Sequence, residues 1–436
     1  METVHIDTPF IISSVIAALT LGVIISEKLH RTIVAFLGAI IMMVAGVAFN
    51  FFSANDAFAT VDLKTLGLLF GSMIMVAVLE ETGVFQYLGI LTAQKTKGNP
   101  WLLMVGLGFL TFSLSLFLNN VTTVMLVAPV AITIARILKI SPIPLLISEA
   151  IMANIGGVGT LVGHPPNILI GYAAHISFNQ FFIHAFPVAF ASLIATLLML
   201  KLIYKKELSR KPENIEELMR MRPKEAIVQP KIAMITLPVL AVVIILFFIQ
   251  DKIGLDASVI SLIGAALVLF LVNPKKDPKD VFAKIEVSLL LFFTSLFVIF
   301  GALEKTGVLD YLAQLIVSDA KENLLMTSVI IMWAGAFISA VIDNIPLAVA
   351  MIPIINHLGM EGVPTGILWW ALIFGVGYGG HGTPIGSAAN LVAVAQSEQN
   401  GTPITLKIWL KTGMASMIIC LIVGTIALLV MNKYIL

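Results

Sequence analysis

Two glycine-rich segments carry residue types that suit the binding of a small ion. Gly156–Asn167 reads GGVGTLVGHPPN, and Gly379–Asn390 reads GGHGTPIGSAAN. Asn, Thr and Ser supply neutral oxygen ligands and amide donors, while glycine lets the backbone approach a ligand closely. Both segments interrupt apolar sequence, so we expect them to be breaks within helices that help to form a binding site.

Two polar pairs, Asn119-Asn120 and Asp343-Asn344, interrupt apolar sequence in the same way. Asp343 is the most informative single residue, because an unpaired carboxylate inside a membrane domain is costly and usually functional. A proton or Na⁺ could neutralise it, which makes it a candidate for ion exchange. The alternative is a structural role, in which Asp343 caps the helix that starts near Pro346.

Three further titratable residues lie in or near the glycine-rich segments. His164 and His381 lie within them, and either is a candidate proton carrier near neutral pH or, alternatively, a hydrogen-bonded structural histidine. Glu149 lies just before the first segment, either as a second titratable site or near the membrane surface. No P-loop, catalytic cluster or metal cluster is visible, so we expect a protein that is not an enzyme and needs no cofactor beyond a coupling Na⁺ or H⁺.

Composition places these segments in a membrane protein. Of the 436 residues, 59% are hydrophobic and 12% are charged, and the mean hydropathy is +1.02. The single Cys420 excludes an internal disulfide, and the net charge of +1 gives no reason to expect a nucleic-acid partner. Seven apolar stretches are long enough to cross a bilayer as helices: Pro9–Ser26, Thr32–Phe52, Phe181–Leu200, Ile232–Ile249, Ala257–Val272, Val287–Leu303 and Gly413–Met431.

The chain is an internal duplication. LEETGVFQYL at Leu79–Leu88 returns as LEKTGVLDYL at Leu303–Leu312, and the polar pairs and glycine-rich segments correspond in the same order. We therefore predict a first inverted repeat (1–203), a cytoplasmic linker (204–231) and a second inverted repeat (232–436). The linker is expected to form a surface helix or, alternatively, a segment that docks a partner.

We predict that each half contains five membrane-crossing helices and one re-entrant hairpin, with a polar pair at the hairpin tip. The hairpins are expected at Trp101–Lys139 and Leu324–His357. Five crossings are an odd number, so the second half should be inverted, giving an all-α fold with about ten transmembrane helices. Most of the 26 Lys and Arg residues then fall on one side, which is the cytoplasm if both termini lie outside.

Inverted repeats bring their helix breaks together near the middle of the membrane. There, helix amino termini present positive dipole ends to anions, and carbonyl ends coordinate cations. Small residues also serve helix packing alone, but four breaks at matched positions favour a binding site. This pattern is typical of a secondary transporter.

The motifs around the breaks resemble those of a known group. FLNNVTTVMLVAP at Phe117–Pro129 and NIGGVGTLVGHPPN at Asn154–Asn167 are similar to the arsenite permease and P protein (pink-eyed dilution) branch of the ion transporter superfamily, which has a citrate-transporter-like fold. VIDNIP at Val341–Pro346 agrees in the second half. The resemblance implies a dimer in which a mobile part of each protomer, containing both hairpins, moves the site across the membrane in an elevator-like step.

The resemblance also implies a set of substrate- or ion-binding residues in both halves. They are Asn119, Asn120, Thr122, Asn154, Gly157, Thr160, Asn167, Asp343, Asn344, Gly380, Thr383, Ser387 and Asn390.

Two departures from the group's pattern bear on the substrate. Members often have Asp-Asn where this chain has Asn119-Asn120. They also often have Gly-Asp-Pro-Pro-Asn at 163–167, where this chain has His164 in place of the Asp. Both remove a negative charge and favour a neutral or anionic substrate. We therefore expect an ion-coupled or potential-driven transporter of a small inorganic or organic anion, or of arsenite, in a prokaryotic inner membrane. The alternatives are a sodium/proton antiporter that uses Asp343, and the membrane subunit of an efflux pump whose ATPase docks at Lys201–Lys231.

Overall fold

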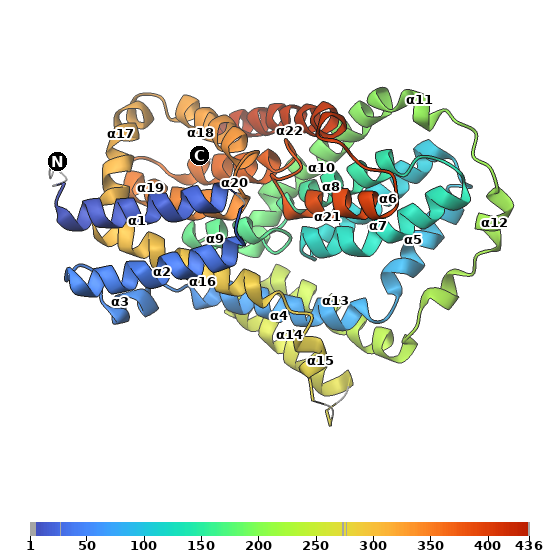
Figure 1. The fold of residues 1–436 in the computed structure, drawn as a ribbon, viewed down its shortest axis with the longest axis horizontal. Coiled ribbons are helices and arrows are strands. Elements are labelled where there is room, and N and C mark those ends of the chain that lie inside the picture. The colour runs from blue at the N-terminus through green and yellow to red at the C-terminus, as the bar shows by residue number, and fades with distance from the viewer. Residues whose placement is uncertain (1–5, 27, 273, 276, 435–436) are drawn as a thin grey trace.

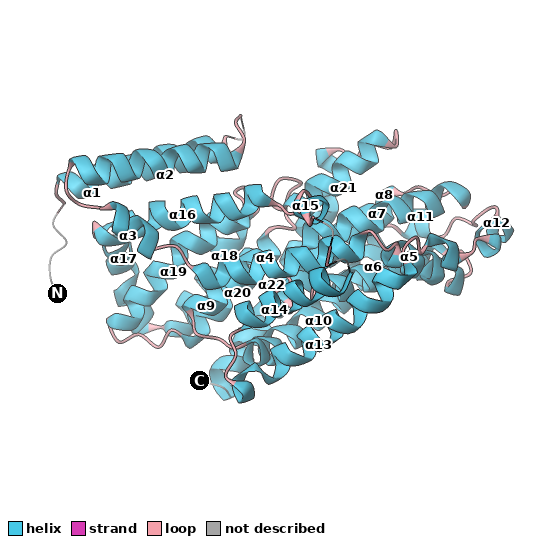
Figure 2. Cartoon of the chain, turned by 90° about the horizontal axis from the view of Figure 1, so that it is seen from below, coloured by secondary structure: helices cyan, strands magenta, loops and turns pink. Residues whose placement is uncertain are grey.

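The computed structural model describes residues 6–26, 28–272, 274–275 and 277–434, and its regular elements within these ranges are all helices (Figure 2). Lys276, which we counted among the cytoplasmic basic residues, and the ends of the chain at 1–5 and 435–436 lie outside the described residues. The first half consists of α1 (Thr8–Ile25), α2 (Arg31–Ala48), α3 (Ala54–Ala59), α4 (Leu63–Glu80), α5 (Val84–Lys95), α6 (Pro100–Ser115), α7 (Asn120–Ile137), α8 (Ile143–Val158), α9 (Pro165–Ala173) and α10 (Phe178–Ile203).

The second half repeats this order after a short linker. The linker contains α11 (Lys205–Leu208), α12 (Ile215–Arg220) and η1 (Pro223–Ala226). The second half consists of α13 (Pro230–Ile253), α14 (Ala257–Val272), α15 (Lys279–Phe282), α16 (Val287–Lys305), α17 (Val308–Glu322), α18 (Leu324–Ser339), α19 (Asn344–Met360), α20 (Gly366–Gly379), α21 (Ala388–Gln399) and α22 (Leu406–Tyr434).

Eight of the described helices are long and apolar enough to span a membrane: α1, α2, α4, α7, α10, α13, α16 and α22. α14 is shorter, and α8–α9 and α20–α21 are the two interrupted segments that the glycine-rich motifs predicted. The prediction of an all-helical, multi-pass membrane protein is confirmed. It remains a prediction that the chain crosses the membrane about ten times. The re-entrant path of the helix pairs α6–α7 and α18–α19 is also still a prediction.

The helices form two groups, each of which packs mainly within itself. The frame group consists of α1, α2, α4, α13, α14 and α16, and the hairpin group consists of α6–α10 and α18–α22 (Figure 1). Close contacts in each group rely on glycine: a Cβ at Gly71 would meet Ser261 across the α4–α14 contact. Gly156 and its repeat equivalent Gly379 lie against the backbones of Phe112 in α6 and Ala336 in α18. Side chains at these glycines would force the helices apart.

A glycine with positive φ stands at each joint where the chain leaves the frame group for a hairpin. Gly83 (φ 78°) precedes α5, and Gly307 (φ 75°) precedes α17. The linker packs on the first joint, where the Val228 N–H donates to the Thr82 carbonyl (3.0 Å), and a Cβ at Gly83 would overlap the Ala226 carbonyl. Glycine is therefore required at Gly83 by both conformation and space.

We predict that Gly83→Ala destabilises the protein much more than Gly254→Ala. Gly254 also has positive φ (67°) but has open space where the Cβ would be, so it reports the backbone strain alone, about 1 kcal/mol. Gly83→Ala adds the overlap with the linker backbone and should lower the melting temperature of the detergent-purified protein further. Equal melting temperatures for the two variants would contradict the described packing of the linker.

Candidate functional site

A cavity of about 170 Å³ lies where the two halves of the chain meet. The helices that begin at it are α2, α7, α9, α16, α19 and α21, which come from both groups and both halves. Its lining consists of Arg31, Asn119, Asn120, Val121, His164, Pro165, Pro166, Glu286, Leu289, Asp343, Asn344, Ile345, Ser387 and Ala388. The structure thus brings together both polar pairs and the ends of both glycine-rich segments, as their matched positions suggested.

Two symmetry-related side-chain contacts join the two halves across this cavity. The Asn344 Nδ2 atom lies 3.2 Å from His164 Nε2, so the second polar pair contacts the first glycine-rich segment. Reciprocally, Asn120 Nδ2 donates to Ser387 Oγ (3.4 Å). The repeat pairs His164 with Ser387 and Asn120 with Asn344, so these two contacts are related by the internal symmetry. All four side chains are buried.

Asn154 links both halves from behind the cavity. Its Oδ1 accepts from Asn120 Nδ2 (2.8 Å) and from Ser387 Oγ (2.9 Å), and its Nδ2 donates to Asn390 Oδ1 (2.9 Å). One buried amide therefore satisfies polar groups from a hairpin tip and from the opposite break. Such a fully connected network fixes its members in place.

Other predicted residues shape the breaks instead of lining the cavity. Asn167 Nδ2 donates to the carbonyls of Gly157 (2.9 Å) and Thr160 (2.8 Å), and its repeat equivalent Asn390 donates to those of Gly380 (2.7 Å) and Thr383 (2.9 Å). The hydroxyls of Thr160 and Thr383 donate to the carbonyls of Leu116 and Ala340, at the ends of α6 and α18. These bonds satisfy backbone groups that the broken helices leave open.

The expectation that Asp343 is an unpaired carboxylate is wrong. Its Oδ2 forms an ion pair with the guanidinium of Arg31, the first residue of α2, and its Oδ1 caps α19 by accepting from the Ile345 N–H (3.2 Å). A membrane carboxylate that lacks a proton needs such a partner, because an isolated charge in low dielectric is very costly. Asp343 therefore caps a helix, as the structural alternative proposed, and it also forms an ion pair that the sequence did not reveal.

Arg31 and Glu286 are charged residues of the cavity that the sequence motifs did not predict. Each is a charged residue directly before an apolar stretch, and such residues usually lie at the membrane surface. The only signal was their position at a predicted helix start, where a long side chain can reach inward.

A second cavity of about 170 Å³ adjoins the first and shares Asn119, Pro165 and Glu286 with it. Thr122, a predicted binding residue, lines this second cavity together with Lys284.

Two of the predicted proton carriers do not line either cavity. His381 is buried, with its Nδ1 3.2 Å from Ser416 Oγ and its carbonyl accepting from the Trp409 indole. Glu149 is buried within α8, and neither of its carboxylate oxygens has a hydrogen-bond partner among the described residues. Within the described part of the chain, no group of three His, Cys, Asp or Glu side chains is placed to hold a metal ion.

The electrostatics of the cavity favour an anion. Arg31, Asp343 and Glu286 together carry one net negative charge. Against it stand six helix amino termini, each equivalent to roughly half a positive charge. The summed helix ends, about three positive charges, exceed the negative side-chain charge. Asn and Ser side chains add hydrogen-bond donors at the same place.

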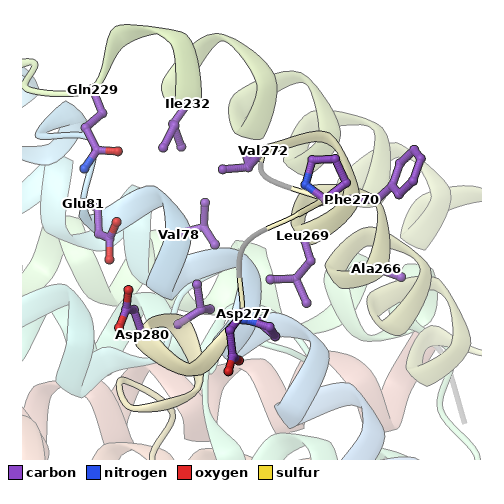
Figure 3. Close-up of a pocket in the computed structure, with 13 residues that line it drawn as sticks. Val78, Glu81, Gln229, Ile232, Ala266, Leu269, Phe270, Val272, Asp277 and Asp280 are labelled. Carbon is purple, nitrogen blue, oxygen red and sulfur yellow. The ribbon is translucent and has the colours of Figure 1, made fainter.

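A larger cavity lies elsewhere and lacks these features. It has a volume of about 530 Å³ and lies between the ends of α4 and α14 and the start of α13 (Figure 3). Its polar residues include Glu81, Asp277 and Asp280, and the described residues that line it include none from α8, α9, α20 or α21. Acidic groups beside apolar side chains make it a poor site for a small anion.

Known proteins resemble this chain in sequence and in fold. Residues 21–375 match the family model described as citrate transporter. The chain belongs to the citrate transporter family. Its relatives include a 46 kDa membrane protein of Mycobacterium leprae (32% identical, covering 96% of this chain and 98% of the relative) and an uncharacterized transporter of Synechocystis (32%, covering 92% and 93%).

The human P protein is 29% identical over 98% of this chain and 60% of its own length, which confirms the resemblance seen in the motifs. The YdaH transporter of Alcanivorax borkumensis has the same fold, with a TM-score of 0.61, 13% sequence identity and coverage of 98% of this chain and 99% of that one. The protein is therefore a membrane transporter.

We predict that Asn154→Ala abolishes transport and lowers stability. Removing this amide leaves Asn120 and Asn390 with unsatisfied buried groups, each costing about 1–3 kcal/mol. Asn323→Ala is a matched control, because Asn323 caps α18 far from the cavity and its loss costs about 1 kcal/mol. Thermal unfolding and uptake assays on the same preparations separate the two effects. Normal transport by Asn154→Ala would contradict the proposed role of the network.

Proposed function

We propose that this protein is a secondary transporter of a small organic anion of the carboxylate class. The observation that carries the proposal is the convergence of six helix amino termini and Arg31 on one cavity. Preorganised helix ends stabilise carboxylates well, because they need no reorganisation when the ligand binds. The family's description as citrate transporter supports the same chemical class.

We further propose that the hairpin group carries the site across the membrane in an elevator-like step. Support comes from the packing, since the cavity lies between the frame and hairpin groups and each half has one glycine with positive φ where the chain leaves the frame group, Gly83 and Gly307. A homodimer, as the resemblance implies, would hold the frame group still. Uptake would be driven by a coupled Na⁺ or H⁺, or by the membrane potential.

Ion pairs between separate elements support the proposed grouping of the loops on two sides of the membrane, and the excess of Lys and Arg on one of these sides supports an orientation with both termini outside an inner membrane. Those that join residues predicted outside are Lys64–Asp256 (3.0 Å), Lys305–Asp56 (2.5 Å) and Lys321–Glu361 (3.4 Å). Those that join residues predicted in the cytoplasm are Lys139–Glu213 (2.7 Å) and Lys284–Glu81 (3.1 Å). In this orientation Arg31 and Glu286 reach the cavity from the cytoplasmic side.

The alternatives receive less support. Sodium/proton exchange through Asp343 requires a carboxylate that is free to bind a cation, whereas this one is paired with Arg31. Arsenite, a neutral species at physiological pH, would gain little from the helix dipoles. In the linker, Gln94 Nε2 donates to the carbonyls of Leu218 (3.1 Å) and Met221 (2.7 Å), so part of the surface proposed for an ATPase already packs on α5.

We predict that purified protein in liposomes takes up labelled citrate when a gradient is imposed, and that Asn120→Ala and Asn344→Ala reduce uptake by roughly tenfold or more. Each variant removes a buried donor at the cavity, and one lost hydrogen bond to a charged ligand costs about 1.5–3 kcal/mol. Asn99→Ala, which removes only the cap of α6, should transport at the normal rate.

Absence of citrate uptake by folded wild-type protein would reject the carboxylate class. A sodium pulse in the same vesicles then tests the antiport alternative. A change of internal pH that is lost in Asp343→Asn would establish exchange in its place.

A further inference from the structure

The Arg31–Asp343 ion pair joins the two groups of helices at the cavity. Arg31 is the first residue of α2 in the frame group, and Asp343 caps α19 at the tip of the second hairpin. The other ion pairs given above for the frame group, Lys64–Asp256 and Lys284–Glu81, stay among its own helices and connections. This pair must break if the hairpin group slides past the frame.

Arg31 is anchored on the frame side by further contacts. Its guanidinium lies over the ring of Phe292 in α16, 5.4 Å from the ring centre, and its charge interacts with Glu286 at the start of the same helix. Its side chain is 35% exposed and that of Asp343 is 20% exposed, so the pair is only partly screened by water. Among the described residues that line the cavity, Arg31 is the one Lys or Arg.

We propose that Arg31 is a positioning residue that latches the second hairpin to the frame while the site is empty. An anion that enters the cavity competes with Asp343 for the guanidinium and releases the hairpin. This last step rests on the proposed function, whereas the latch itself does not. The latch would make movement of the empty carrier slow and movement of the loaded carrier fast.

The latch can be observed without any substrate. Spin labels are placed at Phe58→Cys in α3, which packs on the frame group, and at Met360→Cys at the end of α19, in a Cys420→Ala background that removes the native thiol. Both labelled positions are highly exposed, at 76% and 77%. Pulsed electron–electron double resonance in liposomes then reports the distance between the two labels, and so between the frame group and the second hairpin.

We expect the parent protein to show one narrow distance between the labels. In Arg31→Gln, a second distance should appear, and its population should exceed that in the parent on the order of tenfold, because the state held by the charge-assisted ion pair loses this stabilisation. The conservative variant Arg31→Lys, which keeps a positive charge beside Asp343, should keep the single distance. Lys64→Gln, which breaks a pair within the frame group, should leave it unchanged. A single unchanged distance in Arg31→Gln overturns the latch.

Addition of citrate to the parent protein separates this inference from the proposed function. A second population that appears with citrate supports both. An effect of Arg31→Gln without any effect of citrate leaves the latch standing and rejects citrate as the ligand that opens it.

Discussion

The need to satisfy open backbone groups inside an apolar medium governs this structure. Two apolar helical segments, α8–α9 and α20–α21, are interrupted in the described chain, and lipid would offer no hydrogen bonds to their exposed amides and carbonyls. The breaks after α8 and α20 solve this identically: an Asn side chain, Asn167 or Asn390, bonds two carbonyls of its own loop, and a Thr hydroxyl, Thr160 or Thr383, bonds the end of the preceding hairpin arm. The interruptions are thereby rigid, and the helix ends that they create remain available to a ligand.

Duplication gives the site its paired architecture, and small departures from symmetry give it its charge. The reciprocal contacts Asn344–His164 and Asn120–Ser387 bind each hairpin to the opposite break. Asp343, in contrast, corresponds to a neutral Asn119, and its charge is balanced by Arg31 from outside the repeated motifs. The cavity therefore keeps the positive potential of its helix ends with one carboxylate fewer than a symmetric pair of Asp-Asn tips would supply.

Repeats and composition were sufficient to predict the helical fold, the interrupted segments and the convergence of the two polar pairs, because matched breaks in two repeated halves were expected to meet. The separate roles of the predicted residues could not be predicted. Thr160, Asn167 and their equivalents share motifs with the cavity residues, yet their side chains bond backbone carbonyls of the breaks and of the neighbouring helix ends. Sequence spacing alone does not encode this side-chain direction. The sequence did not place Arg31 and Glu286 in the site, because a charged residue that precedes an apolar stretch usually lies at the membrane surface. Only the packing shows that their side chains reach the cavity.

The most direct test of the account is calorimetric titration of the purified wild-type protein with citrate and with its uncharged tris-amide. We expect citrate to bind with measurable heat and the amide of the same shape not to bind, since the six helix amino termini and Arg31 act on charge. Equal binding of the two compounds, or binding of sodium ions with no binding of citrate, would contradict the claim that this cavity is built for an anion.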